Sequence, residues 1–247
     1  MPSKPDPFSS SVWTHPPRGR GTQPPLSRDQ IVRAAIELLD AEGAAGLSMR
    51  RLGTKLGSGA TSVYWYVAHK DELLELAVDQ VMGEVYVPDP DDTGWRIGAS
   101  VFTSGLRAML LRHPWVIGLL GVRPAMGPNA MRNGDRMVAL LSAAGFSGLE
   151  LAHASSLLMA YAIGSASTVA ALTSTSREAG VPVTEIVTRI EPYLDLIAAD
   201  HPHYDKWRRE IGPAARDPER VWEDGFMFGL ERLLDGLELW LSRRTGG

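Results

Sequence analysis

The chain has 247 residues, enough for one large domain or two smaller ones, and an ordinary hydrophobic fraction of 44%. It contains no cysteine, which excludes disulfides and thiolate metal sites. The net charge of −4 does not by itself indicate a nucleic-acid partner, but residues 1–70 carry nine Lys and Arg against five Asp and Glu, while the remainder carries 16 against 24. A small basic segment on an acidic body is typical of a protein that binds a polyanion locally.

Residues 1–26 are rich in Pro, Ser and Gly, so we expect a disordered N-terminal tail there. The tail has no apolar core segment of the kind that a signal peptide needs, and a cytoplasmic protein is therefore expected. Order is expected to begin at Ser27, because "SRDQ" has the form of a capping box.

Three helices are predicted in the first ordered segment. An apolar repeat with helical spacing follows Ser27, and Gly43 is placed to end that helix. Ser48 and Gly57 bound a second, short helix, and a third is predicted from about residue 60 to 67. A fourth helix follows at once in "AHKDELLELAVDQVMGEV".

After the polar break "PDPDD", the remaining pattern is again helical. The helices are expected near residues 94–112, 114–121, 129–144, 148–173, 183–199 and 217–243. Strand signals are absent, so the predicted fold class is all-α. The stretch from Leu151 to Ser176 carries no charged residue, which raises the question of a membrane span. Because hydroxyl side chains are scattered through it, we expect instead a helix buried on nearly all sides, and no membrane partner.

The second and third helices, joined by a short glycine-containing turn, predict a helix-turn-helix, in which the second helix enters the major groove of DNA. Val63 and Val67 lie four apart and can face the protein, whereas Tyr64 and Trp65 cannot both share that face. No acid occurs between Gly43 and Lys70, so the cations there would attract phosphate. The alternative is that the rings are core packing and the basic side chains are merely solvated.

The stretch "LSRDQIVRAAIELLDAEGAAGLSMRRLGTKLGSGATSVYWYVAHKDELLELAVD" resembles the N-terminal domain of TetR-family transcriptional regulators, and its "YW" pair resembles the tetracycline-repressor branch. The resemblance implies base- or sugar-contacting roles for Arg50, Ala60, Thr61, Ser62, Tyr64 and Trp65, and backbone-contacting roles for Tyr66 and Lys70. Arg51 would add general attraction to phosphate. The chain departs from the family pattern at Met49, Gly59 and His69, and Ala60 offers no hydrogen bond to a base.

The later segments "RHPW" and "FGLERLLDGLELWL" are similar to landmarks of the same family's ligand-binding and dimerisation domain. The expected division is a tail at residues 1–26, a three-helix DNA-binding domain at 27–75 and a helical ligand-binding and dimerisation domain at 76–247. The resemblance implies a four-helix bundle between two subunits, for which the small residues are Gly164, Ala166, Ala170, Gly225 and Gly229. Candidates to line an effector pocket are Trp95, Phe102, Met109, Trp115, Met126, Met137, Met159 and Tyr161.

The function that this reasoning predicts is a ligand-responsive transcriptional regulator, a homodimeric repressor that binds a pseudo-palindromic DNA operator and is released by a small-molecule effector. Catalytic motifs such as GxSxG, HExxH and Walker A are absent, so we expect no enzyme and no cofactor. His113, His201 and His203 raise the question of a metal. His113 precedes a proline and is expected to contact the carbonyls at the end of a helix, and "HPHYDKW" is expected to form an exposed loop, so no metal site is predicted. The alternatives are a helical small-molecule binding protein whose N-terminal domain has lost DNA affinity and, more remotely, an enzyme.

Overall fold

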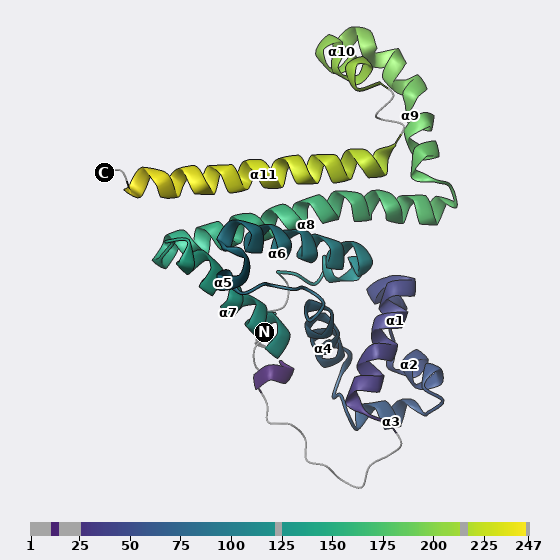
Figure 1. The fold of residues 1–247 in the computed structure, drawn as a ribbon. Helices are drawn as coiled ribbons and strands as arrows, with labels where there is room; N and C mark the ends of the chain where they lie inside the picture. The colour runs from purple at the N-terminus through teal and green to yellow at the C-terminus, as the bar shows by residue number, and fades with distance from the viewer. Residues whose placement is uncertain (1–10, 15–25, 122–124, 213–216, 246–247) are drawn as a thin grey trace, which may run out of the picture. The chain divides into compact units, whose positions relative to one another are not determined.

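The computed structural model describes residues 11–14, 26–121, 125–212 and 217–245 (Figure 1). Helices and the turns between them make up this part of the chain, which holds no β-strand, and the predicted all-α fold is confirmed. The chain divides into two compact units, Met1–Ile163 and Gly164–Gly247, which are described separately. The boundary lies inside the long helix α8 (Gly148–Ala179).

Three helices form the first part of unit 1: α1 (Arg28–Gly46), α2 (Met49–Lys55) and α3 (Ala60–Tyr64). The capping box at Ser27 is present, because its hydroxyl accepts a hydrogen bond from the Gln30 amide while the Gln30 side chain accepts one from the Ser27 amide. Gly43 interrupts α1 with a φ of 68°, a conformation that glycine adopts without strain. The helix was predicted to end at Gly43; instead α1 is kinked there and continues to Gly46.

The core of these helices is aliphatic. Ile31, Leu39 and Leu52 are almost completely buried, and so are Val63 and Val67, the two valines expected to face inward. The predicted helix over residues 60–67 is too long, however, since α3 ends at Tyr64. Trp65 and Tyr66 lie in a turn, and Val67 reaches the core from outside the helix.

The other long helices of unit 1 are α4 (Lys70–Met82), α6 (Trp95–Arg112), α7 (Pro128–Ala143) and the first part of α8. A single turn, α5 (Pro90–Thr93), occupies the expected polar break before α6. The predicted helix at 114–121 is wrong: the structure has a 3₁₀ turn, η2 (Pro114–Val116), followed by turns. A proline begins this turn and Gly118 follows it, a composition that limits helix propagation.

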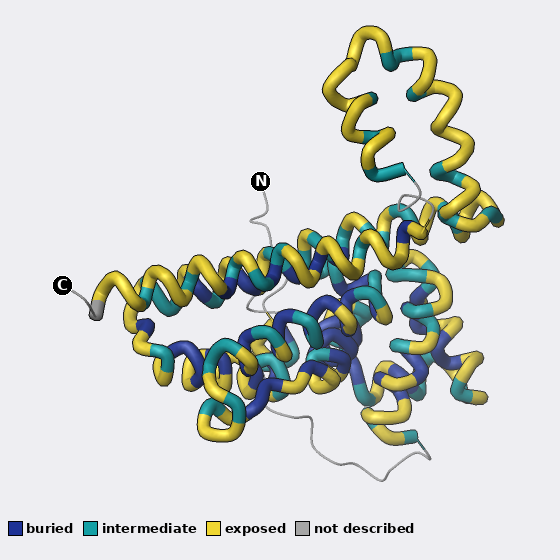
Figure 2. The backbone as a smooth tube through the Cα atoms, turned by 45° about the horizontal axis from the view of Figure 1, so that its top comes forward, coloured by how far each residue is buried: buried dark blue, intermediate teal, exposed yellow. Residues whose placement is uncertain are grey.

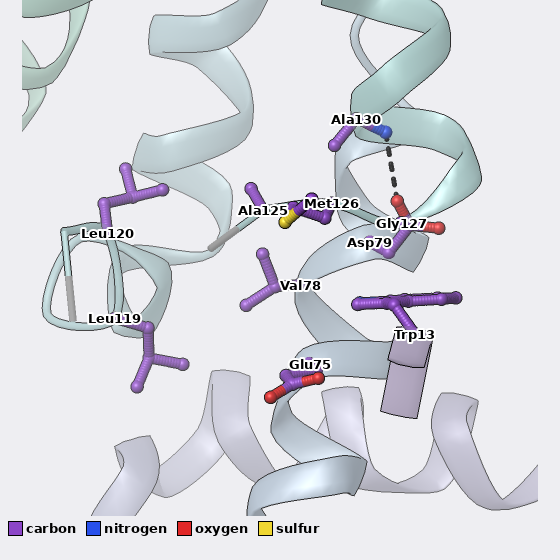
Figure 3. Close-up of a pocket in the computed structure, with 10 residues that line it drawn as sticks. All are labelled: Trp13, Glu75, Val78, Asp79, Leu119, Leu120, Ala125, Met126, Gly127 and Ala130. Carbon is purple, nitrogen blue, oxygen red and sulfur yellow. Dashed lines mark hydrogen bonds between the residues drawn. The ribbon is translucent and has the colours of Figure 1, made fainter. Parts of the chain in front are cut away.

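Helix α7 is joined to α4 through the buried carboxylate of Asp79. Its Oδ1 accepts hydrogen bonds from the backbone amides of Asn129 and Ala130, both at 3.0 Å. Figure 3 shows the bond from Ala130. The residue before α7 is Gly127, which has no side chain to cap the helix, so a side chain from α4 supplies the cap. A Cβ on Gly127 would lie 2.2 Å from the Asp79 carboxyl carbon, so this close approach requires glycine.

Unit 2 contains the second part of α8, then α9 (Val183–Ile197), η3 (Ala198–Asp200), α10 (Pro202–Ile211) and α11 (Pro218–Thr245). Helix α10 corrects the expectation that "HPHYDKW" forms an exposed loop. Its Asp205 accepts hydrogen bonds from Arg208 and Arg209, and these hold the pKa of the Asp205 carboxyl below its usual value. Neither α9 nor α10 contains a buried residue, as Figure 2 shows.

Helix α8 is long and apolar enough to span a membrane by length and composition, a test that the core helix of a soluble protein also passes. Within this chain it is buried along one stripe with helical spacing: Ala154, Leu158, Ala162 and Ala166. The expectation of a helix covered on nearly all sides is therefore not met within one chain, since 17% of its most apolar window is buried.

Candidate nucleic-acid interface

The turn between α2 and α3 is held by backbone contacts. The amide of Ser58 donates to the Gly53 carbonyl at 2.9 Å, and the amide of Gly57 donates to the Thr54 carbonyl at 3.1 Å. A Cβ on Gly53 would lie 2.9 Å from the Ala60 nitrogen, so glycine allows the two helices to approach this closely. The result is the predicted helix-turn-helix, with α3 as its second helix.

The aromatic residues at the end of α3 lie on the solvent side. Trp65 is 72% exposed and Tyr64 is 49% exposed, while the adjacent Val63 is fully buried. The sequence prediction that valines and rings occupy opposite sides is therefore consistent with the coordinates. Thr61 is exposed at the start of α3 and Ser62 and Ala60 are half-buried, so the first turn presents short side chains beside the rings.

The cations around the motif are not equivalent. Arg50 is exposed, and its guanidinium makes no hydrogen bond or ion pair with any described residue. The neighbouring Arg51 forms a two-pronged ion pair with Glu42 and also donates to the Gly46 carbonyl at 3.0 Å. The hydrogen bond with Glu42 raises the pKa of Arg51, and the same bond lowers the pKa of Glu42.

Two further cations also have partners within the chain. The Lys55 ammonium lies 2.8 Å from a carboxylate oxygen of Glu37. Lys70 donates from its Nζ to the Ala44 carbonyl at 2.7 Å and is half-buried. The stretch from Gly43 to Lys70 contains no acid, but two glutamates that precede it in α1 pair with its cations.

Tyr66 differs from the two residues before it. It is half-buried, and its hydroxyl donates to the Leu26 carbonyl at the entrance to α1. This contact attaches the segment after α3 to the start of α1. A backbone-contacting role for Tyr66 stays a prediction, and in this structure its hydroxyl is already engaged.

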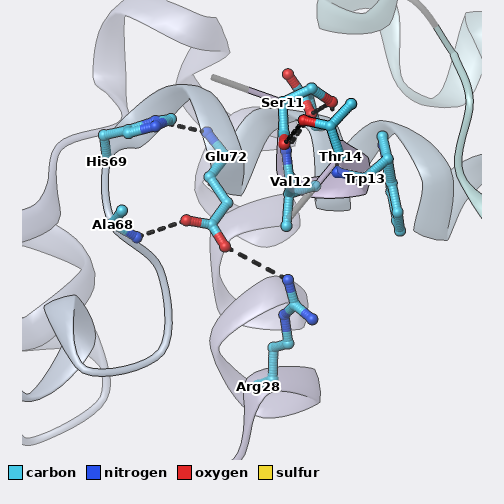
Figure 4. A network of polar contacts seen from close by, with 9 residues as sticks. Ser11, Val12, Trp13, Thr14, Arg28, Ala68, His69 and Glu72 are labelled. Carbon is cyan, nitrogen blue, oxygen red and sulfur yellow. Dashed lines mark hydrogen bonds and ion pairs between the residues drawn. The ribbon is translucent and has the colours of Figure 1, made fainter. Parts of the chain in front are cut away.

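A polar network supports the segment between α3 and α4 (Figure 4). The Nδ1 atom of His69 accepts a hydrogen bond from the Glu72 amide at 3.0 Å, so histidine provides the N-terminal cap of α4. The Glu72 carboxylate accepts from the Ala68 amide at 2.6 Å and pairs with Arg28 at 3.4 Å. Glu72 therefore links α4 to α1 and to the loop that precedes Lys70.

The predicted effector-binding residues differ in how far they are buried. Phe102, Met109, Trp115 and Met137 are buried, Trp95 and Tyr161 are half-buried, and Met126 and Met159 are exposed. The Trp115 indole donates to Asp40 of α1 at 2.7 Å, so it links two parts of unit 1. Burial raises the pKa of the Tyr161 hydroxyl, and the charge of Arg107 opposes this shift.

A small cavity of about 20 Å³ lies beside α4 (Figure 3). Met126 is the one predicted effector-binding residue that lines it. Its other lining residues are Trp13, Glu75, Val78, Asp79, Leu119, Leu120, Ala125, Gly127 and Ala130. The predicted effector site therefore stays a prediction for all eight residues, Met126 included.

The predicted dimer residues lie on α8 and α11. Ala166 is buried, Ala170 and Gly229 are half-buried, and Gly164 and Gly225 are exposed. Large apolar side chains are also exposed on α11, including Phe228 at 65% and Trp240 at 51%.

Two sequence families match the chain. The family described as "Bacterial regulatory proteins, tetR family" matches residues 31–77, which include the helix-turn-helix. The family described as "Tetracyclin repressor-like, C-terminal domain" matches residues 87–241, more than half of the chain. The chain belongs to the TetR family. It is a transcriptional regulator of the helix-turn-helix type.

Relatives of this TetR-family regulator have similar descriptions. An HTH-type transcriptional regulator of Saccharopolyspora erythraea is 43% identical over 157 residues, which are 64% of this chain and 66% of the relative. The HTH-type transcriptional repressor DrrR1 of Streptomyces coeruleorubidus is 34% identical over 92% of this chain and 83% of the relative. The solved structure of apo ActR from Streptomyces coelicolor is 29% identical, covers 90% of this chain and 100% of its own, and has a TM-score of 0.71. ActR has also been solved in complex with actinorhodin.

Sequence reasoning missed one junction in this TetR-family regulator. His113 ends α6, and we expected its ring to contact helix carbonyls there. Instead the ring is buried between two carboxylates, with Nδ1 2.7 Å from Asp40 of α1 and Nε2 3.2 Å from Glu84. Asp40 and Glu84 lie 73 and 29 residues away in sequence, so no local pattern indicated these contacts.

Proposed function

We propose that the chain is a ligand-responsive repressor, which binds a pseudo-palindromic operator as a cytoplasmic homodimer and is released by a small-molecule effector. The observation that supports DNA binding best is the exposure of Tyr64 and Trp65 at the end of α3, opposite the buried Val63. Adjacent large aromatic side chains on a surface are typical of an interaction site, whereas single exposed ones are common. Repression is proposed because DrrR1, a relative over most of the chain, is described as a repressor.

In this proposal α3 lies in the major groove and α2 crosses the backbone. Thr61 and Ser62 in the first turn of α3 reach base edges or phosphate oxygens, and the rings of Tyr64 and Trp65 pack on sugars and thymine methyl groups. Arg50, which is exposed on α2, is the candidate to contact guanine. Lys70 and Arg51 act mainly through their charge.

The dimer is proposed to form through α8 and α11. Three large apolar side chains of α8, at Leu149, Leu157 and Met159, are exposed. Phe228 and Trp240 of α11 are exposed as well. A monomer rarely leaves so many on two long helices, and the small residues Gly164, Ala166, Ala170, Gly225 and Gly229 would allow a partner's helices to approach closely.

The complex of ActR with actinorhodin supports a small-molecule effector for this chain. Actinorhodin is therefore the first compound to test, by measuring operator affinity with and without it. Reduced affinity would support release by an effector of this kind. Unchanged affinity would exclude actinorhodin and leave the DNA-binding proposal as it stands.

The decisive experiment is selection of bound fragments from a random DNA pool with the purified protein. We expect two related half-sites separated by about one helical turn, roughly 10 base pairs, or a multiple of it. The variant Trp65→Ala should bind the selected operator more weakly, whereas Trp207→Ala in α10 should not change binding. If no fragment is enriched, the protein is better described as a small-molecule binding protein without DNA affinity.

A further inference from the structure

The N-terminal segment Ser11–Thr14 packs against α4, a helix more than 50 residues later in the sequence. It forms a compact turn in which the Ser11 carbonyl accepts hydrogen bonds from the Thr14 amide at 3.2 Å and the Thr14 hydroxyl at 2.9 Å. The Ser11 hydroxyl in turn accepts from the Trp13 amide at 3.4 Å. This segment precedes the part of the chain that the family descriptions match, which begins at residue 31. The N-terminal tail was expected to be disordered, and for Ser11–Thr14 the structure differs from that expectation. Residues 1–10 and 15–25 of the tail lie outside the described residues.

The segment is held by Glu75, a carboxylate in the apolar middle of α4. Glu75 is 6% exposed, and its Oε2 accepts hydrogen bonds from the Ser11 hydroxyl at 2.7 Å and from the Val12 amide at 3.1 Å. Burying a carboxylate is unfavourable unless donors replace its water. The segment supplies two such donors, and Glu75 binds the segment through them.

Trp13 of the same segment forms one wall of the cavity beside α4, as Figure 3 shows. The cavity is too small for anything larger than one or two water molecules. A larger ligand can therefore enter only if a wall moves. The Asp79 wall is fastened by its bonds to the N-terminus of α7, an element of the packed helices, whereas the Trp13 wall belongs to Ser11–Thr14, a turn that hydrogen-bonds to α4 through Glu75.

The contacts of the segment also indicate what could replace it. The segment brings a planar ring, the indole of Trp13, together with O–H and N–H donors for a buried carboxylate. A planar aromatic amine offers the same two features and adds a positive charge beside Glu75 and Asp79. We propose that Ser11–Thr14 is an internal ligand of α4, and that planar aromatic amines bind this cavity by displacing it.

The binding step does not depend on the proposed DNA-binding function and can be tested without DNA. The full-length protein is labelled with 5-fluorotryptophan, which gives one ¹⁹F resonance for each of its seven tryptophans. Trp13→Phe identifies the Trp13 resonance by its disappearance. Tryptamine is the probe, because it carries an indole ring and an ammonium group. Indole-3-propionate is the control, since it has the same ring with a negative charge.

We expect tryptamine to shift the Trp13 resonance in a saturable manner, and indole-3-propionate to leave it in place. Trp13→Ala removes the ring of the competing segment and should strengthen tryptamine binding, measured by calorimetry; if the ring keeps the segment docked in about 90% of molecules, the increase is about tenfold. Trp207→Ala in α10 serves as the matched control and should change nothing. Glu75→Gln keeps the shape of the side chain but removes its charge, and should weaken tryptamine binding about fivefold.

Two results would overturn the proposal. One is a Trp13 resonance that stays unmoved at saturating tryptamine, which would mean that the segment is a fixed part of the fold. The other is tryptamine binding with equal affinity to the unmodified protein and to Trp13→Ala, which would place the amine elsewhere. Neither result would bear on operator binding, which the DNA selection tests separately.

Discussion

Two adjacent arginines of α2 have different surroundings, and the difference predicts different roles in DNA binding. Arg50 is exposed without a partner among the described residues, whereas Arg51 is paired with Glu42. We therefore predict that Arg50→Ala weakens operator binding by about 1–3 kcal/mol and relaxes preference at one base position. Fluorescence anisotropy on the selected operator and its single-base variants measures both effects. An equal loss on every sequence would make Arg50 a backbone contact instead.

The pair between Arg51 and Glu42 also yields a prediction about salt. Glu42→Gln would release the Arg51 guanidinium from its ion pair and leave one more cation available to phosphate. The slope of log affinity against log salt concentration should then become steeper by about one. Glu231→Gln on α11, far from the motif in sequence, is the control and should leave the slope unchanged. An unaltered slope in Glu42→Gln would show that Arg51 points away from the DNA.

At the scale of elements, α7 depends on α4 for its N-terminal cap. Asp79→Asn keeps a hydrogen-bond acceptor but removes the negative charge from the N-terminus of α7 and disturbs the bonds to Asn129 and Ala130. We expect the free energy of unfolding to fall by about 1–2 kcal/mol. Urea denaturation measures this loss. Asp135→Asn, on an exposed position of the same helix, should change stability by less than about 0.5 kcal/mol.

In the helix-turn-helix, local sequence signals predict the helix caps, whereas packing determines where the helices end. The caps at Ser27 and Ser48 were predictable, because they depend on residues three positions apart. The length of α3 was not, since Val67 satisfies the helical spacing but reaches the core from a turn. At the cap of α4, the sequence showed only that His69 departs from the family pattern, because propensities favour Ser or Asn there; the structure shows that its Nδ1 atom supplies the cap.

For the whole molecule, the proposed dimer makes a direct prediction. Phe228→Asp places a charge among the exposed apolar side chains of α11 and should weaken dimerisation by about 2 kcal/mol or more, roughly a thirtyfold change in the dissociation constant. Sedimentation velocity at micromolar concentration measures the change. Val138→Asp on α7, also exposed, is the matched control and should stay dimeric. If the unmodified protein sediments as a monomer, the proposed bundle of α8 and α11 is wrong.

The sequence by itself determined the all-α class, the helix-turn-helix and the outward rings of Tyr64 and Trp65. These follow from apolar spacing, capping residues and a family resemblance, all of which act over a few neighbouring residues or one short motif. Only the tertiary structure decided which side chains meet across long separations. It paired Arg51 with Glu42, Asp79 with the N-terminus of α7, and Ser11 with Glu75. Such contacts depend on how helices pack, and no local spacing encodes which buried charge a distant donor will satisfy.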